Sequence, residues 1–136
     1  MLSSVRLACI DPDTVGCYWP FARNFIKRAI DRAGLSDFDV IEADVLTGKQ
    51  LLWLAWSASK IEGAGTTQIV GAGGRKICVI VAWGGGDKRR FLPLLARIEA
   101  YAKAEGCSVI RIYGRKGWER VLDGFSSKCV VLDKDL

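Results

Sequence analysis

The chain has 136 residues, half of them hydrophobic and about a quarter charged, so we expect one folded domain spanning residues 1–136 rather than a disordered chain. Its net charge of +5 favours an anionic partner such as a phosphate, a nucleotide cofactor or nucleic acid. The sequence has no histidine, which excludes the commonest general base and every nucleophile that is paired with histidine.

The sequence also argues against a metal site and a membrane span. None of the five cysteines forms a CxxC pair, which disfavours a disulfide framework and a structural zinc site. No apolar run reaches the ~18 residues that a membrane span needs, and the apolar stretch at the N-terminus is too short for a signal peptide. We therefore expect a cytoplasmic protein without a metal ion.

The first part of the chain predicts a strand and then a helix. Residues 3–10 mix apolar and polar positions as a first strand does. Between residues 18 and 33 the apolar positions fall on one helical face. Pro20 suits the first turn of this helix, and Gly34 suits its end.

A shorter second helix follows. Ser36 or Asp37 can cap its N-terminus, and the helix should extend to about Val45. Residues 47–49, Thr-Gly-Lys, should end it.

Three strand-like runs come next, at residues 51–59, 66–73 and 76–83. The last, KICVIVAW, is almost entirely β-branched or aromatic, which predicts a central strand that is buried on both faces. Short links that contain glycine join the runs, so we expect antiparallel hairpins.

A helix and a further strand follow the glycines at 84–86. Because proline is tolerated only in the first turn of a helix, Pro93 predicts a regular helix that begins between residues 90 and 92. Gly106 should end it, and residues 107–113 should form a strand parallel to the strand at 76–83.

The last residues predict a short helix within 115–125 and a final strand at 127–136. The predicted order is β-α-α-β-β-β-α-β-α-β. This order predicts the α/β class, with a mixed sheet in the sense of α+β folds and helices on its faces.

Three segments of the C-terminal half follow a known pattern. Residues 94–114 are LLARIEAYAKAEGCSVIRIYG, residues 115–125 are RKGWERVLDGF and residues 129–136 are CVVLDKDL. They resemble the long helix with its following strand, the short helix with its Gly-Phe corner and the closing strand of the GNAT superfamily, the Gcn5-related N-acetyltransferases. The N-terminal half is similar in element order. The resemblance implies a single GNAT-like domain.

A second resemblance concerns residues 114–118, Gly-Arg-Lys-Gly-Trp. This segment is similar to one in small GNAT-like proteins of tailed bacteriophages. It implies that the chain is phage-encoded and acts in the cytoplasm of a bacterial host or as part of a virion.

The GNAT resemblance implies acetyl-CoA as the cofactor. In the family, acetyl-CoA lies between two parallel strands that diverge, and its pantetheine amides pair with the first of them. Its pyrophosphate binds backbone N–H groups at the start of the long helix, where the helix dipole favours an anion. The implied cofactor-binding residues are Val81, Trp83, Gly84, Gly85, Gly86, Lys88, Arg89 and Arg90.

The cofactor loop departs from the family pattern. Aligning Leu94-Leu95 with the family's leucine pair places residues 86–91 on the motif Arg/Gln-x-x-Gly-x-Gly/Ala. Arg89 and Phe91 then replace the two glycines, and Gly86 replaces the leading Arg or Gln. The motif is therefore degenerate.

The catalytic positions of the family also differ. Many members protonate the leaving thiolate with a tyrosine on the short helix, where this chain has Arg120, so Tyr113 is the candidate substitute. Many members deprotonate the amine with a glutamate on a central strand. Because KICVIVAW has no acid, Glu62 and Asp87 are the nearest candidates.

Three functions remain open at this point. The first is an acetyl-CoA-dependent N-acetyltransferase that acts on an amine. The second is a non-catalytic GNAT-fold structural or assembly component, whose partners are phage proteins or further copies of itself. The third is nucleic-acid binding, which we rank last because the basic residues are spread over more than one surface.

Overall fold

The computed structural model describes residues 5–58, 60–86, 88–113, 118, 122–128 and 130–136. Its elements are β1 (Arg6–Cys9), η1 (Pro12–Thr14), α1 (Val15–Ala33), α2 (Phe38–Leu46), β2 (Leu51–Ser57), β3 (Lys60–Ala72), β4 (Arg75–Gly85), α3 (Lys88–Phe91), η2 (Leu92–Leu94), α4 (Leu95–Ala104) and β5 (Val109–Ile112). None of the helices in these residues has the length and apolar character of a membrane span.

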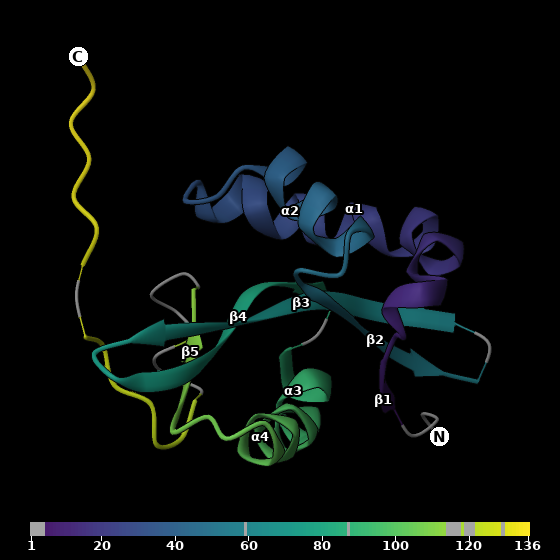
Figure 1. The fold of residues 1–136 in the computed structure, drawn as a ribbon. Helices are drawn as coiled ribbons and strands as arrows, with labels where there is room; N and C mark the ends of the chain where they lie inside the picture. Colours follow the sequence, from purple (N-terminus) through teal and green to yellow (C-terminus); the bar gives the residue numbers. More distant parts are fainter. Residues whose placement is uncertain (1–4, 59, 87, 114–117, 119–121, 129) are drawn as a thin grey trace.

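The strands form one five-stranded sheet in the order β1-β2-β3-β4-β5 (Figure 1). The first four pair antiparallel, and β5 pairs parallel to β4. These pairings confirm the predicted hairpins and the predicted parallel connection through a helix. The predicted mixed α/β fold class is also confirmed.

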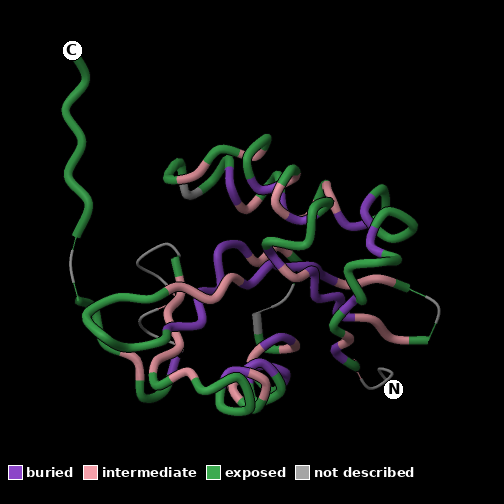
Figure 2. Tube along the Cα trace, in the orientation of Figure 1, coloured by how far each residue is buried: buried purple, intermediate pink, exposed green. Residues whose placement is uncertain are grey.

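Helices cover both faces of this sheet. In Figure 1, α1 and α2 lie on one face, and α3 and α4 lie on the other. The buried hydrophobic residues accordingly form two clusters, one between each helical layer and the sheet. Figure 2 shows this burial along the middle of the molecule.

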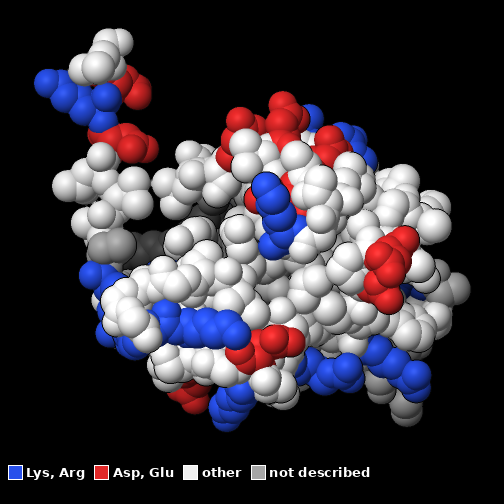
Figure 3. Space-filling model, viewed as in Figure 1, with Lys and Arg blue, Asp and Glu red and all other residues white. Residues whose placement is uncertain are grey.

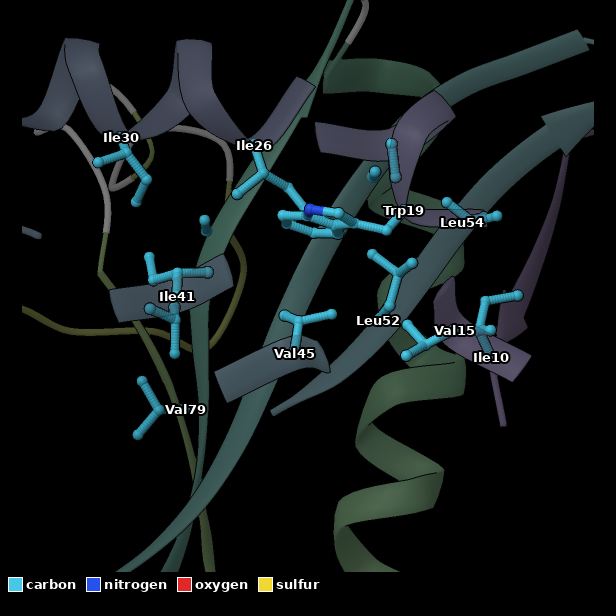
Figure 4. Packing of buried hydrophobic residues seen from close by; sticks show 14 of the residues in the cluster. Ile10, Val15, Trp19, Ile26, Ile30, Ile41, Val45, Leu52, Leu54 and Val79 are labelled. Carbon is cyan, nitrogen blue, oxygen red and sulfur yellow. The ribbon is translucent and has the colours of Figure 1, made fainter. Parts of the chain in front are cut away.

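The cluster beneath α1 and α2 follows from the helical repeat. Ala22, Ile26 and Ile30 recur every four residues, and each is at most 5% exposed. Trp19 lies on the same layer, and its Nε1 donates a 2.7 Å hydrogen bond to Oε2 of Glu42 on α2. Figure 4 shows Trp19, Ile26 and Ile30 among the buried side chains between helices and strands.

The start of α1 differs from the prediction. The helix begins at Val15, because a turn that starts at Pro12 leads directly into it. Pro20 therefore lies inside the helix, where it removes one backbone hydrogen bond. The predicted end is confirmed, since Gly34 adopts a left-handed φ of 67°. Of the two candidate caps of α2, Asp37 is the one whose side chain accepts a backbone N–H.

β3 begins well before the predicted residue 66 and takes in two glycines that we expected in a link. A Cβ on Gly63 would lie 2.8 Å from the carbonyl oxygen of Gly84, and a Cβ on Gly65 would lie 2.3 Å from the ring of Trp83. These two glycines therefore admit the close approach of β4, and they do not form a turn.

The helical segment after β4 is divided at Pro93. It begins with the short α3 at Lys88 and continues as the 3₁₀ turn that contains Pro93. The regular α4 begins at Leu95, later than the predicted residues 90–92, because proline cannot donate the hydrogen bond that a continuous helix needs. Gly106 follows its end with a φ of 83°, as predicted.

The prediction of a final strand at 127–136 is wrong for the described residues. Val130, Val131 and Leu132 are 60–87% exposed, and Figures 1 and 2 show this tail extending away from the sheet. A strand needs a neighbouring edge for its hydrogen bonds, and no described strand pairs with the tail. Most of the predicted short helix at 115–125 lies outside the described residues.

Candidate functional site

The parallel pair β4–β5 ends before β4 does. The pairing begins at Ile77 and Val109 and ends at Ile80 and Ile112, followed by a 3.2 Å hydrogen bond from the N–H of Tyr113 to the carbonyl of Ile80. β4 then continues to Gly85 with β3 as its neighbour among the described strands. Among the described strands, none pairs with the other edge of this second half of β4.

Two β-bulges lie at the same end of the sheet. On β4 the register shifts so that Val81 has no partner opposite it, between the pairs of Ile80 and Ala82. On β3 the register shifts at Glu62 in the same way. A bulge bends its strand and redirects side chains, and bulges are frequent beside active sites.

Both bulged residues line a cavity of about 430 Å³. Its walls come from α1, the α1–α2 connection, β3, the second half of β4, the end of β5 and Phe91. The volume is within the range of small-molecule sites, which is ~300–1,000 Å³. The described structure therefore has a cavity where the pairing of the two parallel strands ends.

Glu62 is held by two donors at the edge of this cavity. Nε of Arg90 lies 2.5 Å from its Oε1, the second Arg90 contact to Oε2 is 2.9 Å, and the hydroxyl of Ser57 also donates to Oε2. The hydrogen bonds from Arg90 and then Ser57 lower the pKa of the Glu62 carboxyl to about 2. Such a carboxylate is ionised at neutral pH and a weak proton acceptor.

Aromatic side chains close the cavity on the α3 side. Phe91 is 3% exposed, and its ring stacks on Trp83 with centroids 4.0 Å apart. It also meets Trp118 edge to face at 5.8 Å. Phe91 is therefore a packing residue at the start of the helical segment.

The three glycines after Trp83 have different surroundings. A Cβ on Gly84 would lie 1.9 Å from the carbonyl oxygen of Phe25 on α1, so Gly84 is required for helix–sheet packing. A Cβ on Gly85 would lie 3.0 Å from the carbonyl oxygen of Glu62. A Cβ on Gly86 would meet nothing within 4 Å. Of the three, only Gly86 has open space around it.

The structure brings most of the sequence-predicted site residues together. Val81, Trp83, the three glycines at 84–86, Glu62 and Tyr113 all line the cavity, and the Tyr113 side chain is 48% exposed. Arg90 reaches the site through Glu62. Arg89 is exposed on the helical turn and does not line the cavity, and the side chain of Lys88 lies outside the description.

Sequence reasoning missed the wall contributed by α1. Phe25, Arg28, Ala29 and Arg32 share one face of this helix and line the cavity, and Lys60 joins them from β3. The helical spacing in the sequence already places the α1 residues on one face. Which part of the sheet this face meets is decided by tertiary packing.

No metal site is evident. The described residues contain no group of three Cys, Asp or Glu side chains that could hold an ion. The described lining offers a backbone edge, arginine and lysine side chains, Glu62 and Tyr113 for chemistry.

Solved structures with the same fold are numerous, although no protein-family model and no curated protein sequence matches the chain. Aminoglycoside acetyltransferase HMB0005, from an uncultured soil metagenomic sample, matches with a TM-score of 0.69 and 13% identity, over 98% of this chain and 97% of that chain. Aminoglycoside N-acetyltransferase AAC(6')-Iy, in complex with CoA, matches with a TM-score of 0.68 and 12% identity, over 99% of this chain and 97% of that chain. A GNAT family acetyltransferase from Staphylococcus aureus matches with a TM-score of 0.62 and 15% identity, over 98% of this chain and 99% of that chain.

The fold of the chain follows from this likeness. The chain has the fold of the GNAT acetyltransferases over nearly its whole length. The fold expected from the sequence resemblance is thereby confirmed. At these identities the likeness establishes the fold, and the activity has to be argued from the site.

Proposed function

We propose that this protein binds acetyl-CoA along the open edge of β4 and transfers its acetyl group to an amine in the cavity beside α1. The observation that carries the proposal is the end of the β4–β5 pairing at Ile80, with a cavity of about 430 Å³ at that point. The extended backbone of residues 81–85 offers the pantetheine amides a strand edge to pair with. The CoA complex of the structural neighbour AAC(6')-Iy supports this choice of cofactor.

Tyr113 is the proposed proton donor to the leaving thiolate. It follows the last residue of β5, lines the cavity and has an exposed phenol. Glu62 is not a suitable base for the amine, because Arg90 and Ser57 hold its pKa at about 2. We therefore propose that water accepts the amine proton and that Glu62 holds Arg90 in place.

Isothermal titration with acetyl-CoA tests the binding step. We expect a Kd tighter than about 1 mM, which corresponds to about −4 kcal/mol. If no heat is detected at millimolar ligand, acetyl-CoA is not the cofactor and the proposal fails.

Release of free CoA thiol tests the transfer step. Tyr113→Phe should lower kcat about 100-fold, as expected for the loss of a general acid, and should leave the affinity for acetyl-CoA unchanged. Tyr101→Phe is the matched control, because Tyr101 packs edge to face on Trp53 and does not line the cavity. Equal rates for Tyr113→Phe and the wild type would remove Tyr113 from the mechanism.

A second candidate is a non-catalytic protein of the same fold, such as the phage structural component predicted from the sequence. It is favoured by the Arg90–Glu62 pair, which occupies the one carboxylate among the described lining residues. Binding of acetyl-CoA without transfer to any amine in a broad panel would support this candidate over the enzyme.

A further inference from the structure

The charges around the cavity are unevenly distributed. Its described lining contains three cationic side chains, from Arg28, Arg32 and Lys60, and one carboxylate, from Glu62. Both oxygens of Glu62 accept hydrogen bonds from Arg90. The single negative charge of the lining is thus paired with Arg90, and the charge of Lys60 also acts on it. Arg28, Arg32 and Lys60 are all exposed.

The three cations differ from Arg23 and Arg90, which each form an ion pair with a glutamate. Arg23, on the same helix, lies 3.4 Å from Glu42 of α2. Within the described residues, Arg28, Arg32 and Lys60 form no ion pair. Figure 3 shows acidic side chains gathered over the helical layer of α1 and α2, at the top of the view. The acids of this layer that lie on α2 are Asp39, Glu42 and Asp44, and none of them lines the cavity.

The positions of Arg28 and Arg32 suit an anion. They lie four residues apart, so they project from neighbouring turns of one helix face, where like charges disfavour the helix slightly. An anion that lies between them relieves this repulsion and accepts charge-assisted hydrogen bonds from two planar guanidinium groups. Lys60 faces the same cavity from the start of β3.

We propose that the acceptor of the acetyl group is an anionic amine, whose carboxylate or phosphate is recognised by Arg28, Arg32 and Lys60. The inference rests on the proposed function for the identity of the reaction, but the anion-binding site does not. It also separates this chain from its structural neighbours that are named aminoglycoside acetyltransferases. Aminoglycosides carry several ammonium groups at neutral pH, and a cationic rim repels them.

The test uses amine probes of opposite charge. O-phosphoserine and the dipeptide Gly-Glu are the anionic probes, and kanamycin is the polycationic one. Each is titrated by calorimetry into the full chain, with and without saturating CoA. We expect the anionic probes to bind, to bind more weakly as salt is raised, and to bind more tightly than kanamycin by about tenfold or more.

Charge reversal locates the site. Arg28→Glu with Arg32→Glu should weaken binding of the anionic probes by about tenfold or more and strengthen binding of kanamycin. Lys27→Glu with Lys49→Glu is the matched control, since it changes the net charge equally at exposed residues that do not line the cavity. Far-ultraviolet circular dichroism and thermal midpoints show whether both double variants are folded.

Three results would overturn the inference. The first is binding of kanamycin to the wild type at least as tightly as the anionic probes, and the second is no binding of any anionic probe. The third is a loss of affinity for acetyl-CoA in the Arg28/Arg32 variant, which would assign the two arginines to the phosphates of the cofactor. Anionic binding without any affinity for acetyl-CoA would instead support the anion site and reject the proposed function, so the two failures are distinguishable.

Discussion

The two halves of β4 have the same extended backbone and different neighbours. Residues 77–80 pair with β3 on one side and β5 on the other, and each is at most 2% exposed. Residues 81–85 line the cavity and begin with the bulge at Val81, and among the described strands residues 82–85 pair with β3 alone. The first half of β4 therefore belongs to the core, and the second half forms a wall of the cavity. The two halves differ because β5 pairs only with the first.

This comparison explains why the glycines cluster where they do. In the first half of β4 the space beside the backbone is filled by β5 and by apolar side chains. In the second half, Gly84 is contacted directly by the backbone of α1 at Phe25. Gly84, which the sequence resemblance assigns to the cofactor site, is needed for packing in the structure.

The largest expected effect comes from Gly84→Ala. The added Cβ would lie 1.9 Å from the carbonyl oxygen of Phe25, so α1 or the end of β4 must move. We expect a loss of about 3 kcal/mol or more in the free energy of unfolding. Urea unfolding measures it, and Gly86→Ala is the control with no atom within 4 Å. Equal stability of the two variants would show that Gly84 is not a packing requirement.

Ile77→Val tests the paired half of the strand. Ile77 is 0% exposed and lies outside the cavity lining, so the variant removes one buried methyl group from the core. We expect a loss of about 1 kcal/mol in the free energy of unfolding. The Kd for acetyl-CoA, measured by titration, should not change. A weaker Kd would mean that the two halves are coupled, contrary to the comparison.

Glu62→Gln tests the ion pair at the open half. The pKa of Glu62 is about 2 in the folded protein against an ordinary 4.5, so the ionised form favours folding. This contribution is complete above about pH 4.5 and is lost as the pH falls towards 2. The wild type should therefore lose its advantage over Glu62→Gln across this window, in urea unfolding at a series of pH values.

A second variant checks the cause of that pH dependence. Ser57→Ala removes the smaller of the two hydrogen-bond contributions to the Glu62 pKa and leaves Arg90 in place. The pH range over which the ionised Glu62 loses its stabilising contribution should then become narrower, because the pKa of Glu62 in the folded protein moves back towards its ordinary value. An unchanged difference between wild type and Glu62→Gln from pH 7 to pH 2 would show that the carboxylate is not stabilised by these donors.

The smallest effect is expected at the C-terminal tail, whose described residues pair with neither half of β4. Deleting residues 130–136 should change the free energy of unfolding by less than about 0.5 kcal/mol, because these residues are exposed. Binding of acetyl-CoA should also be unchanged. A larger loss of stability would indicate that the tail pairs with the sheet in solution.

Much of the fold could be predicted from local patterns. The repeat of Ala22, Ile26 and Ile30 identifies α1, and the dense β-branched run at 76–83 identifies β4 as a buried interior strand, because burial selects for such residues. The link glycines at 63 and 65 misled the prediction. A glycine in sequence does not show whether it turns the chain or admits a neighbour, and here the neighbour is β4.

The site was only partly accessible to sequence reasoning. Glu62 and Tyr113 were candidates by proximity in sequence, and the structure places both on the cavity. The bond between Glu62 and Arg90 joins residues 28 positions apart, so no local pattern indicates it. The same holds for Arg28 and Arg32, whose helix face is predictable and whose place at the end of the sheet is not.

The sequence by itself determined the order of the central elements, the helical faces and the strand β4 that is buried on both faces, because these depend on hydrophobic periods within short segments. Only the tertiary structure decided that β5 stops pairing at Ile80, that Gly84 meets α1 and that Glu62 is bound by Arg90. These features depend on the distances between segments far apart in the chain, which the packing of both helical layers sets.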